Sequence, residues 1–224
     1  MNVTMLLYPR LTQLDLTGPF EVMARFSELE LHLVWKTPDP VRDANGLAIV
    51  PTHTFSTCPP ADIVFVPGGP GQIALMDDTE TLDFLRDQAR TARYVTSVCT
   101  GSLVLAAAGL LKGRRATCHW TSLDQLALFG VTPVSERVVI DGDVITGAGV
   151  TSGIDFALSL CAKLFGQERA RMTQLGMEYD PQPPFTGGSP RTASETDLTQ
   201  AMEAIRPFIE KRRKASQAAA EKLQ

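Results

Sequence analysis

Cys99 is the residue of this sequence whose surroundings best suit covalent chemistry. It follows the apolar run Tyr94–Val98 and precedes Thr100-Gly101-Ser102 and further small residues, a pattern that predicts a strand, a sharp turn and a helix. Backbone N–H groups at a helix start favour a thiolate over a thiol. We therefore expect Cys99 to be a nucleophile at a strand-to-helix elbow. The string only partly matches the Gly-x-Ser-x-Gly elbow of hydrolases, and a buried core cysteine is the alternative.

A second pair of candidates supplies backbone donors. Gly68-Gly69 follows the apolar run Ile63–Pro67, which reads as a strand covered on both faces. In a parallel sheet this turn and Cys99 would meet at the same carboxyl edge. The backbone amides of Gly69 and Thr100 could then form a partial oxyanion hole. An ordinary glycine turn is the alternative, since the string lacks the pattern of a phosphate-binding loop.

Asp15 is the candidate acid and base. It lies between Leu14 and Leu16, immediately before a predicted helix over Thr17–Phe26 with Thr17 as a possible cap. A carboxyl group in partly apolar surroundings has a raised pKa and can give and take protons near neutral pH. The alternative is that Asp15 caps the helix.

The remaining polar residues suggest structural roles. We expect His119 to be a structural histidine rather than a base or a metal ligand, and the same holds for His32 and His53. Cys58, Cys118 and Cys161 are widely spaced from each other and from Cys99, with no C-x-x-C pair, so we expect free thiols and neither zinc nor a disulfide framework. The basic run Lys211–Lys214 reads as a solvated helix end, where cations complement the helix dipole.

These candidates are positioned by alternating strands and helices, which predict an α/β fold with a parallel sheet covered on both faces. The expected elements are strands at Val3–Tyr8, Leu31–Lys36, Ile63–Pro67, Tyr94–Val98 and Arg115–Trp120; hairpins over Val41–Val50 and Arg137–Thr146; and helices at Thr17–Phe26, Thr79–Ala92, Ser122–Phe129, Ser152–Phe165 and Glu195–Leu223. Asp180–Ser194, rich in Pro, Gly and Thr, predicts a loop. We therefore divide the chain into an α/β domain over residues 1–194 and a terminal helix over 195–224.

Composition excludes several protein classes. The 224 residues are 44 % hydrophobic and 21 % charged, with a net charge of −4, which fits a folded globular chain rather than a disordered one. The acidic balance argues against nucleic acid as a partner. No apolar stretch approaches the ~20 residues of a membrane span, and the amino terminus lacks the pattern of a secretory signal. We expect a cytoplasmic protein with no membrane association.

Taken in order, six strings resemble the motifs of the ThiJ/PfpI superfamily. They are Leu14–Val22, Val64–Gly69, Thr96–Ser102, Ala108–Leu111, Arg115–Trp120 and Thr151–Leu158. The resemblance covers most of residues 1–190. The early Asp15 and the pair Cys99-Thr100 are most similar to the isocyanide hydratases of that superfamily, whereas its proteases carry histidine directly after the nucleophile.

The resemblance implies a flavodoxin-like sandwich, a homodimer and a small-molecule substrate, with Cys99 as nucleophile, Asp15 as acid and base, and Thr100 as a nearby hydrogen-bonding residue. It further implies hydration of an isocyanide to an N-substituted formamide without a metal or an organic cofactor. Two alternatives stay open. One is a glyoxalase or deglycase for small aldehydes. The other is a non-catalytic sensor similar to the amino-terminal domain of AraC-type regulators, although one helix after residue 190 is too little for their helix-turn-helix region.

Overall fold

A computed structural model describes residues 1–223 of the chain. Its centre is a seven-stranded sheet in the order β10-β11-β7-β6-β1-β2-β5, in which every neighbouring pair is parallel except β10 and β11. The strands of this sheet are β1 (Asn2–Leu6), β2 (Glu30–Trp35), β5 (His53–Thr54), β6 (Ile63–Val66), β7 (Tyr94–Val98), β10 (Val138–Asp141) and β11 (Val144–Gly147). The expected flavodoxin-like α/β fold is confirmed.

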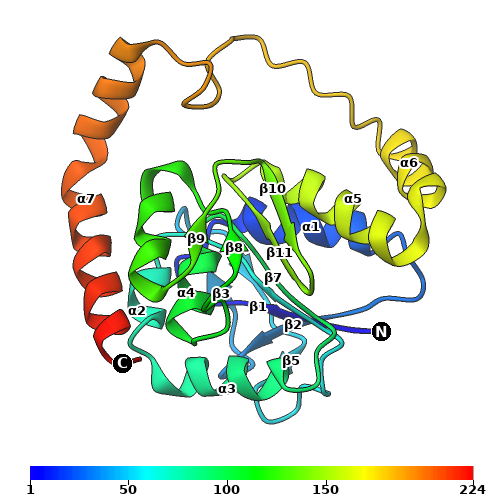
Figure 1. The fold of residues 1–224 in the computed structure, drawn as a ribbon. Helices are drawn as coiled ribbons and strands as arrows, with labels where there is room; N and C mark the ends of the chain where they lie inside the picture. The colour runs from blue at the N-terminus through cyan, green and yellow to red at the C-terminus, as the bar shows by residue number, and fades with distance from the viewer. Residues whose placement is uncertain (224) are drawn as a thin grey trace.

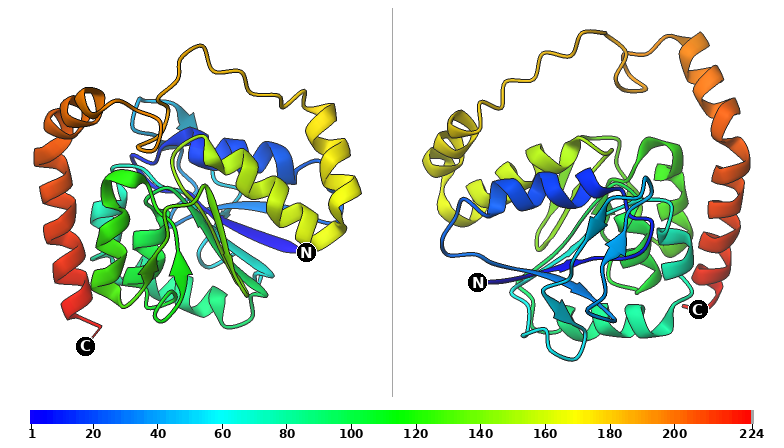
Figure 2. Two further views of the ribbon diagram at one scale, coloured as in Figure 1. Left: turned by 45° about the horizontal axis from the view of Figure 1, so that its top comes forward. Right: turned by 180° about the vertical axis from the view of Figure 1, so that it is seen from behind.

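Helices cover both faces of this sheet (Figures 1 and 2). Helix α1 (Gln13–Met23) packs along α5 (Ser152–Phe165) on one face. On the other face, α3 (Thr79–Ala89) and α4 (Gly101–Ala107) contact the central strands β6 and β7. Both strands are buried along their whole length, and the hydroxyl of Thr96 in β7 is satisfied by the Val64 carbonyl of β6 at 2.8 Å.

Short elements complete the body of the fold. They are β3 (Val41–Arg42) with β4 (Ala48–Ile49) as an antiparallel pair, β8 (Arg115–Ala116) with β9 (Thr132–Pro133) as a parallel pair, α2 (Gln72–Leu75), the 3₁₀ helix η1 (Trp120–Phe129) and α6 (Gln167–Gly176). The two predicted hairpins are confirmed. Helix α6 was not anticipated, because its mostly exposed sequence carries little apolar periodicity.

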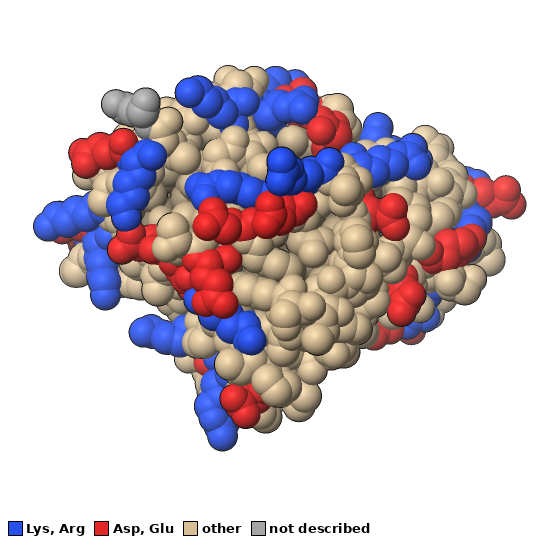
Figure 3. Space-filling model, turned by 90° about the horizontal axis from the view of Figure 1, so that it is seen from below, with Lys and Arg blue, Asp and Glu red and all other residues tan. Residues whose placement is uncertain are grey.

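The carboxyl-terminal helix α7 (Glu195–Glu221) runs along one side of the molecule and packs on η1 and α4. It is joined to α6 by residues 177–194, which contain no helix or strand and pass over the sheet edge, as Figure 1 shows. The predicted loop and helix are therefore both confirmed. No helix among the described residues is long and apolar enough to cross a membrane. On the face shown in Figure 3, basic and acidic side chains are interspersed.

Two boundary predictions near the site are wrong. Helix α1 begins at Gln13 and not at Thr17, whose hydroxyl instead donates to the Gln13 carbonyl. The strand expected over Arg115–Trp120 stops at Ala116, because the next amide, that of Thr117, donates to a side chain of β11 and not to a strand backbone.

Candidate active site

Cys99 occupies a sharp turn between the end of β7 at Val98 and the start of α4 at Gly101. Its φ is +55°, a left-handed conformation that non-glycine residues seldom adopt and that a protein keeps only where its surroundings enforce it. The turn packs closely against its neighbours. The Cys99 amide donates to the Gly147 carbonyl at 3.0 Å, and a Cβ on Gly101 would lie 2.1 Å from the Val66 carbonyl oxygen.

Asp15 lies beside this turn, in the first turn of α1 and with no exposed surface. Its Oδ2 accepts a hydrogen bond from the Gly68 amide at 2.9 Å. A Cβ placed on Gly68 would meet Asp15 Oδ2 and Cys99 Cβ at 2.7 Å and the Thr100 amide at 2.6 Å. These three groups therefore converge on one glycine, and only a residue without a side chain fits between them. The helix-cap interpretation of Asp15 is wrong, because its carboxylate bonds to the Gly68 loop.

Burial controls the proton equilibria of this pair. It raises the pKa of the Asp15 carboxyl to about 7, above its usual 3.8. Burial, together with the charge of Asp15, also raises the pKa of the Cys99 thiol well above its usual range, although the Thr100 amide opposes that rise. The Thr100 amide at the helix start thus favours the thiolate, as expected, but burial and the charge of Asp15 outweigh it. Two adjacent buried acids disfavour a second negative charge, so the pair retains a proton at neutral pH.

The Thr100 side chain lies with Gly69. Its Oγ1 accepts a hydrogen bond from the Gly69 amide at 3.1 Å, in a buried position. The Gly69 amide, expected as an oxyanion donor, is thus already occupied, and the Thr100 hydroxyl is directed to Gly69 and not to Asp15. Of the two expected backbone donors, the Thr100 amide is the one that interacts with Cys99.

The histidines fit structural roles. His119 precedes η1, and its Nδ1 lies 2.8 Å from Thr121 Oγ1. Burial, with the charge of Arg212, lowers the pKa of His119 to about 4, so that it is neutral at physiological pH. His32 and His53 pack against each other, with ring centroids 4.7 Å apart, on β2 and β5 at the far edge of the sheet.

The remaining cysteines and the basic run of α7 have distinct surroundings. All four cysteines are free; Cys118 and Cys161 are buried and Cys58 is half-buried. Among residues 1–223, no His, Cys, Asp and Glu side chains gather into a group that could hold a metal ion. The basic run Lys211–Lys214 lies before the last turns of α7, and Arg212 within it is buried, so the interpretation as a solvated helix end is wrong for that residue.

A pocket of about 320 Å³ lies near the elbow, and neither Cys99 nor Asp15 is among the residues that line it. Four parts of the chain form it: Thr117–Trp120 with Leu123, Ser135–Arg137, Ala148–Thr151, and Gly188–Arg191. The segment Ala148–Thr151 continues directly from Gly147, whose carbonyl accepts a hydrogen bond from the Cys99 amide. Sequence reasoning named none of these as pocket residues and expected His119 to be structural, since no local pattern indicates that the loop after α6 returns to this edge.

Comparison with known proteins identifies relatives of this chain. An isonitrile hydratase of Pseudomonas putida is 50 % identical over 223 residues, which span all of this chain and 98 % of that protein. A glutathione-independent glyoxalase of Caenorhabditis elegans, DJR-1.2, is 31 % identical over 63 % of this chain and 76 % of its own length. The crystal structure of a ThiJ/PfpI family protein from Pseudomonas syringae superposes with a TM-score of 0.93 at 47 % identity, covering 98 % of this chain and 90 % of that one.

The family model described as DJ-1/PfpI matches residues 1–163, which contain the elbow, the Gly68 loop and Asp15. Helix α7 lies outside the matched range. With the fold, the elbow and the full-length relative in agreement, the chain belongs to the DJ-1/PfpI family.

Proposed function

We propose that this protein is an isocyanide hydratase, which adds water to R–N≡C and releases an N-substituted formamide. One observation carries the proposal: a buried carboxyl with a pKa of about 7 converges with a cysteine held at a left-handed elbow on Gly68. Isocyanide hydration requires both a nucleophile and a proton at a single carbon atom, and this pair supplies both. The identity with the isonitrile hydratase of Pseudomonas putida over the whole chain supports the same reaction.

The first half of the reaction forms a covalent bond to Cys99. The sulfur attacks the terminal carbon of the isocyanide while Asp15 gives that carbon the proton held by the pair. The product is a thioimidate, R–N=CH–S–Cys99, and Asp15 is left as a carboxylate. The thiol proton has moved to carbon, so atoms and charge balance without an added reactant.

The second half releases the product. Asp15 takes a proton from water as the oxygen attacks the thioimidate carbon and passes that proton to the nitrogen, which gives R–NH–CH(OH)–S–Cys99 and leaves Asp15 as a carboxylate. Collapse of this tetrahedral species expels the Cys99 sulfur and yields R–NH–CHO. The hydroxyl proton returns to the pair, which is then ready for another substrate.

Thr100 and the neighbouring pocket supply the remaining roles. The Thr100 amide stabilises negative charge on the sulfur, and its hydroxyl, bonded to the Gly69 amide, holds the glycine loop against the elbow. The pocket beside the elbow receives the R group, against the apolar side chains of Trp120, Leu123 and Pro190. No cofactor enters these steps.

A direct assay tests the reaction. Purified protein is incubated with an aryl isocyanide and, separately, with methylglyoxal, and both are followed by absorbance with mass spectrometry of the product. We expect the aryl formamide to accumulate and methylglyoxal to be consumed far more slowly. Rapid consumption of methylglyoxal alone would favour a glyoxalase. Binding without turnover of either compound would favour the non-catalytic sensor.

We further propose that the protein is a cytoplasmic homodimer that binds neither nucleic acid nor membranes. Its free cysteines suit a reducing compartment, and the dimer follows from the resemblance to its superfamily. Light scattering at micromolar concentration should give twice the chain mass of 24.3 kDa. A mass equal to a single chain would contradict the dimer and leave the catalytic proposal intact.

A further inference from the structure

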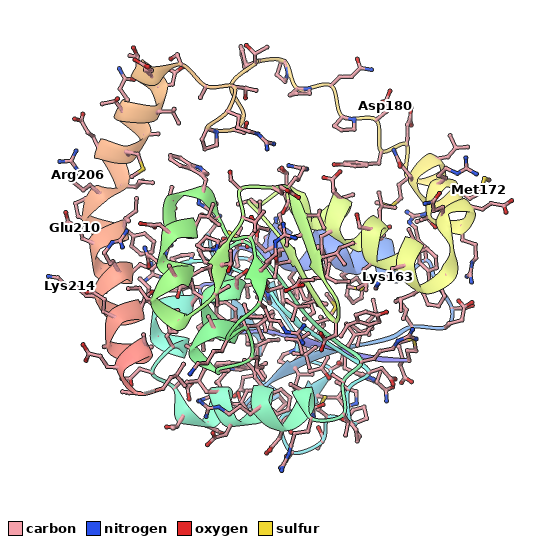
Figure 4. The ribbon with its side chains drawn as sticks, in the orientation of Figure 1. Lys163, Met172, Asp180, Arg206, Glu210 and Lys214 are labelled. Atoms are coloured by element: carbon pink, nitrogen blue, oxygen red, sulfur yellow. The ribbon has the colours of Figure 1, made fainter. Side chains whose placement is uncertain are left out.

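A groove of about 360 Å³ lies where α7 passes α2 and the end of β2. The residues that line this α7 groove include Pro9, Arg10, Trp35, Pro70, Phe208 and Lys211. The α7 groove shares no lining residue with the pocket near the elbow. Arg206, Glu210 and Lys214 of α7 point away from the body, as Figure 4 shows, whereas Lys211 of the same helix lines the groove. The groove is therefore a second candidate site, distinct from the one that the reaction uses.

The walls of the α7 groove are apolar, and neighbouring side chains hold them in place. The Trp35 ring packs edge to face on Phe55, with ring centroids 5.8 Å apart. The Phe208 ring lies beside the buried Arg212, whose Cζ is 4.7 Å from the ring centroid. Pro70 adds a rigid ring. Walls that are fixed before binding lose little entropy on binding, and the volume lies within the range of roughly 300–1,000 Å³ for small-molecule sites.

Two cations of the α7 groove have no acidic partner. Arg10 and Lys211 both line it, and none of the ion pairs among residues 1–223 involves either of them. The acidic residue of the lining, Asp78, is already paired with Lys36 at 2.6 Å. The groove thus presents an excess of positive charge beside an apolar surface. An anionic group attached to an apolar body is complementary to both features.

The backbone at Arg10 is held in an unfavourable conformation. Its φ is +63°, in the left-handed region that non-glycine residues seldom adopt. The Arg10 amide donates to the Arg42 carbonyl at 2.8 Å, and the Arg10 carbonyl accepts from the Gly71 amide at 3.1 Å. A Cβ on Gly71 would lie 2.0 Å from the Pro9 carbonyl oxygen, so the two loops meet closely here. Such strain persists where the surrounding structure enforces it, and here it fixes the point from which the Arg10 side chain extends.

We propose that the α7 groove binds an aromatic carboxylate, at a site separate from the active site. The carboxylate lies between the Arg10 guanidinium and the Lys211 ammonium, and the aromatic ring lies against Trp35 and Phe208. An aromatic body is favoured over an aliphatic one because aromatic rings attract one another beyond their area of contact. Asp78 in the lining disfavours a second negative charge on the ligand, which favours a carboxylate over a phosphate monoester.

The two tryptophans of the chain report on the two sites separately, because Trp35 lines the α7 groove and Trp120 lines the pocket near the elbow. Full-length protein is titrated with 3-phenylpropionate, and nuclear magnetic resonance follows both indole N–H signals, which Trp35→Phe and Trp120→Phe assign. We expect a saturable shift of the Trp35 signal and an unchanged Trp120 signal. The uncharged analogue 3-phenylpropionamide should bind about tenfold more weakly, because it forms no ion pair.

Charge substitutions test the role of the two cations. Arg10→Gln combined with Lys211→Gln should weaken the binding of 3-phenylpropionate about tenfold, and Lys211→Gln alone, on the exposed surface of the helix, about threefold. Arg10→Lys keeps the charge and should bind with nearly the parental affinity. Arg206→Gln combined with Lys214→Gln is the matched control. It removes two cations of the same helix that point away from the body, and it should leave the affinity unchanged.

Several results would overturn the proposal. Equal affinities for the acid and the amide, or an unchanged affinity in the variants that lack Lys211, would show that the cations do not recognise the ligand. A shift of the Trp120 signal alone would place the acid in the pocket near the elbow. A Trp35 signal that changes with protein concentration and not with the acid would assign the groove to a second copy of the chain. None of these measurements involves an isocyanide, so they stand apart from the proposed function.

Discussion

Cys99→Ala should abolish isocyanide hydration, because no other group at the elbow can form the bond to the isocyanide carbon. Cys99→Ser should recover little of the activity. A hydroxyl is far less acidic than a thiol, and the Asp15 carboxyl, with a pKa of about 7, is too weak a base to ionise it. Formation of the aryl formamide, followed by absorbance and by mass spectrometry, measures both variants.

Cys58→Ala is the matched control for this substitution. Cys58 is half-buried, with its sulfur 3.4 Å from Thr4 Oγ1, and it lies away from the elbow. This variant should hydrate isocyanides at the parental rate. Measurable turnover by Cys99→Ala, together with a loss in Cys58→Ala, would remove Cys99 from the mechanism.

Asp15→Asn should lower turnover by roughly 10²-fold or more, since the amide keeps the shape of the carboxyl but cannot deliver a proton to the isocyanide carbon. The hydrogen bond from Gly68 can be kept, because the amide oxygen accepts as Oδ2 does. The fold should therefore be preserved, which circular dichroism would verify. Hydration by Asp15→Asn at a rate near that of the parent would reject the acid–base role and leave Cys99 as a possible nucleophile.

The same substitution should stabilise the protein above neutral pH. The Asp15 carboxyl ionises near 3.8 when unfolded and near 7 when folded, so the folded state binds the extra proton. The free energy of unfolding of the parent therefore falls as pH rises from about 4 to 7, and it stays low above that range. Asp15→Asn removes this loss. We expect urea denaturation to show a gain of roughly 4 kcal/mol at pH 8 and less than about 1 kcal/mol at pH 4.

Asp78→Asn is a control for which we expect the opposite change in the free energy of unfolding. Burial raises the pKa of Asp78, but hydrogen bonds from Lys36 and Thr81 outweigh it and lower the pKa overall. This carboxylate therefore contributes stability above its unfolded pKa, which is lost as pH falls. Asp78→Asn should lose stability at pH 8 and keep its activity. A gain in stability for both variants at pH 8 would show that the effect of Asp15→Asn does not come from its ionisation.

The sequence by itself determined the elements whose signals are local. The run Ile63–Val66 is apolar throughout, and the run Tyr94–Val98 combines apolar residues with two small hydroxyl residues, because both faces of these strands are covered. Each run ends at residues that allow a sharp turn. Parallel strands share one carboxyl edge, so the sequence also predicted that Cys99 and the Gly68 loop would meet. Leu14 and Leu16 placed Asp15 in apolar surroundings, which led to the expectation of a raised pKa.

Other features were decided by contacts between segments far apart in the chain. Helix α1 starts at Gln13, and the strand that begins at Arg115 ends at Ala116, although local propensity favours other boundaries. The Gly69 amide is occupied by Thr100 because the two loops pack together, and the loop at residues 188–191 reaches the pocket only after the chain has passed through α6. These outcomes depend on which groups become neighbours in the folded protein.

Charge and burial gave the largest departures from sequence reasoning. A helix start favours a thiolate when it faces water, but the desolvation of Cys99 and its proximity to Asp15 reverse that preference. Arg212 is one of four basic residues in a row, and nothing in that run distinguishes it from its neighbours. Its burial follows from the packing of α7 on η1, where Arg212 donates to Ser122.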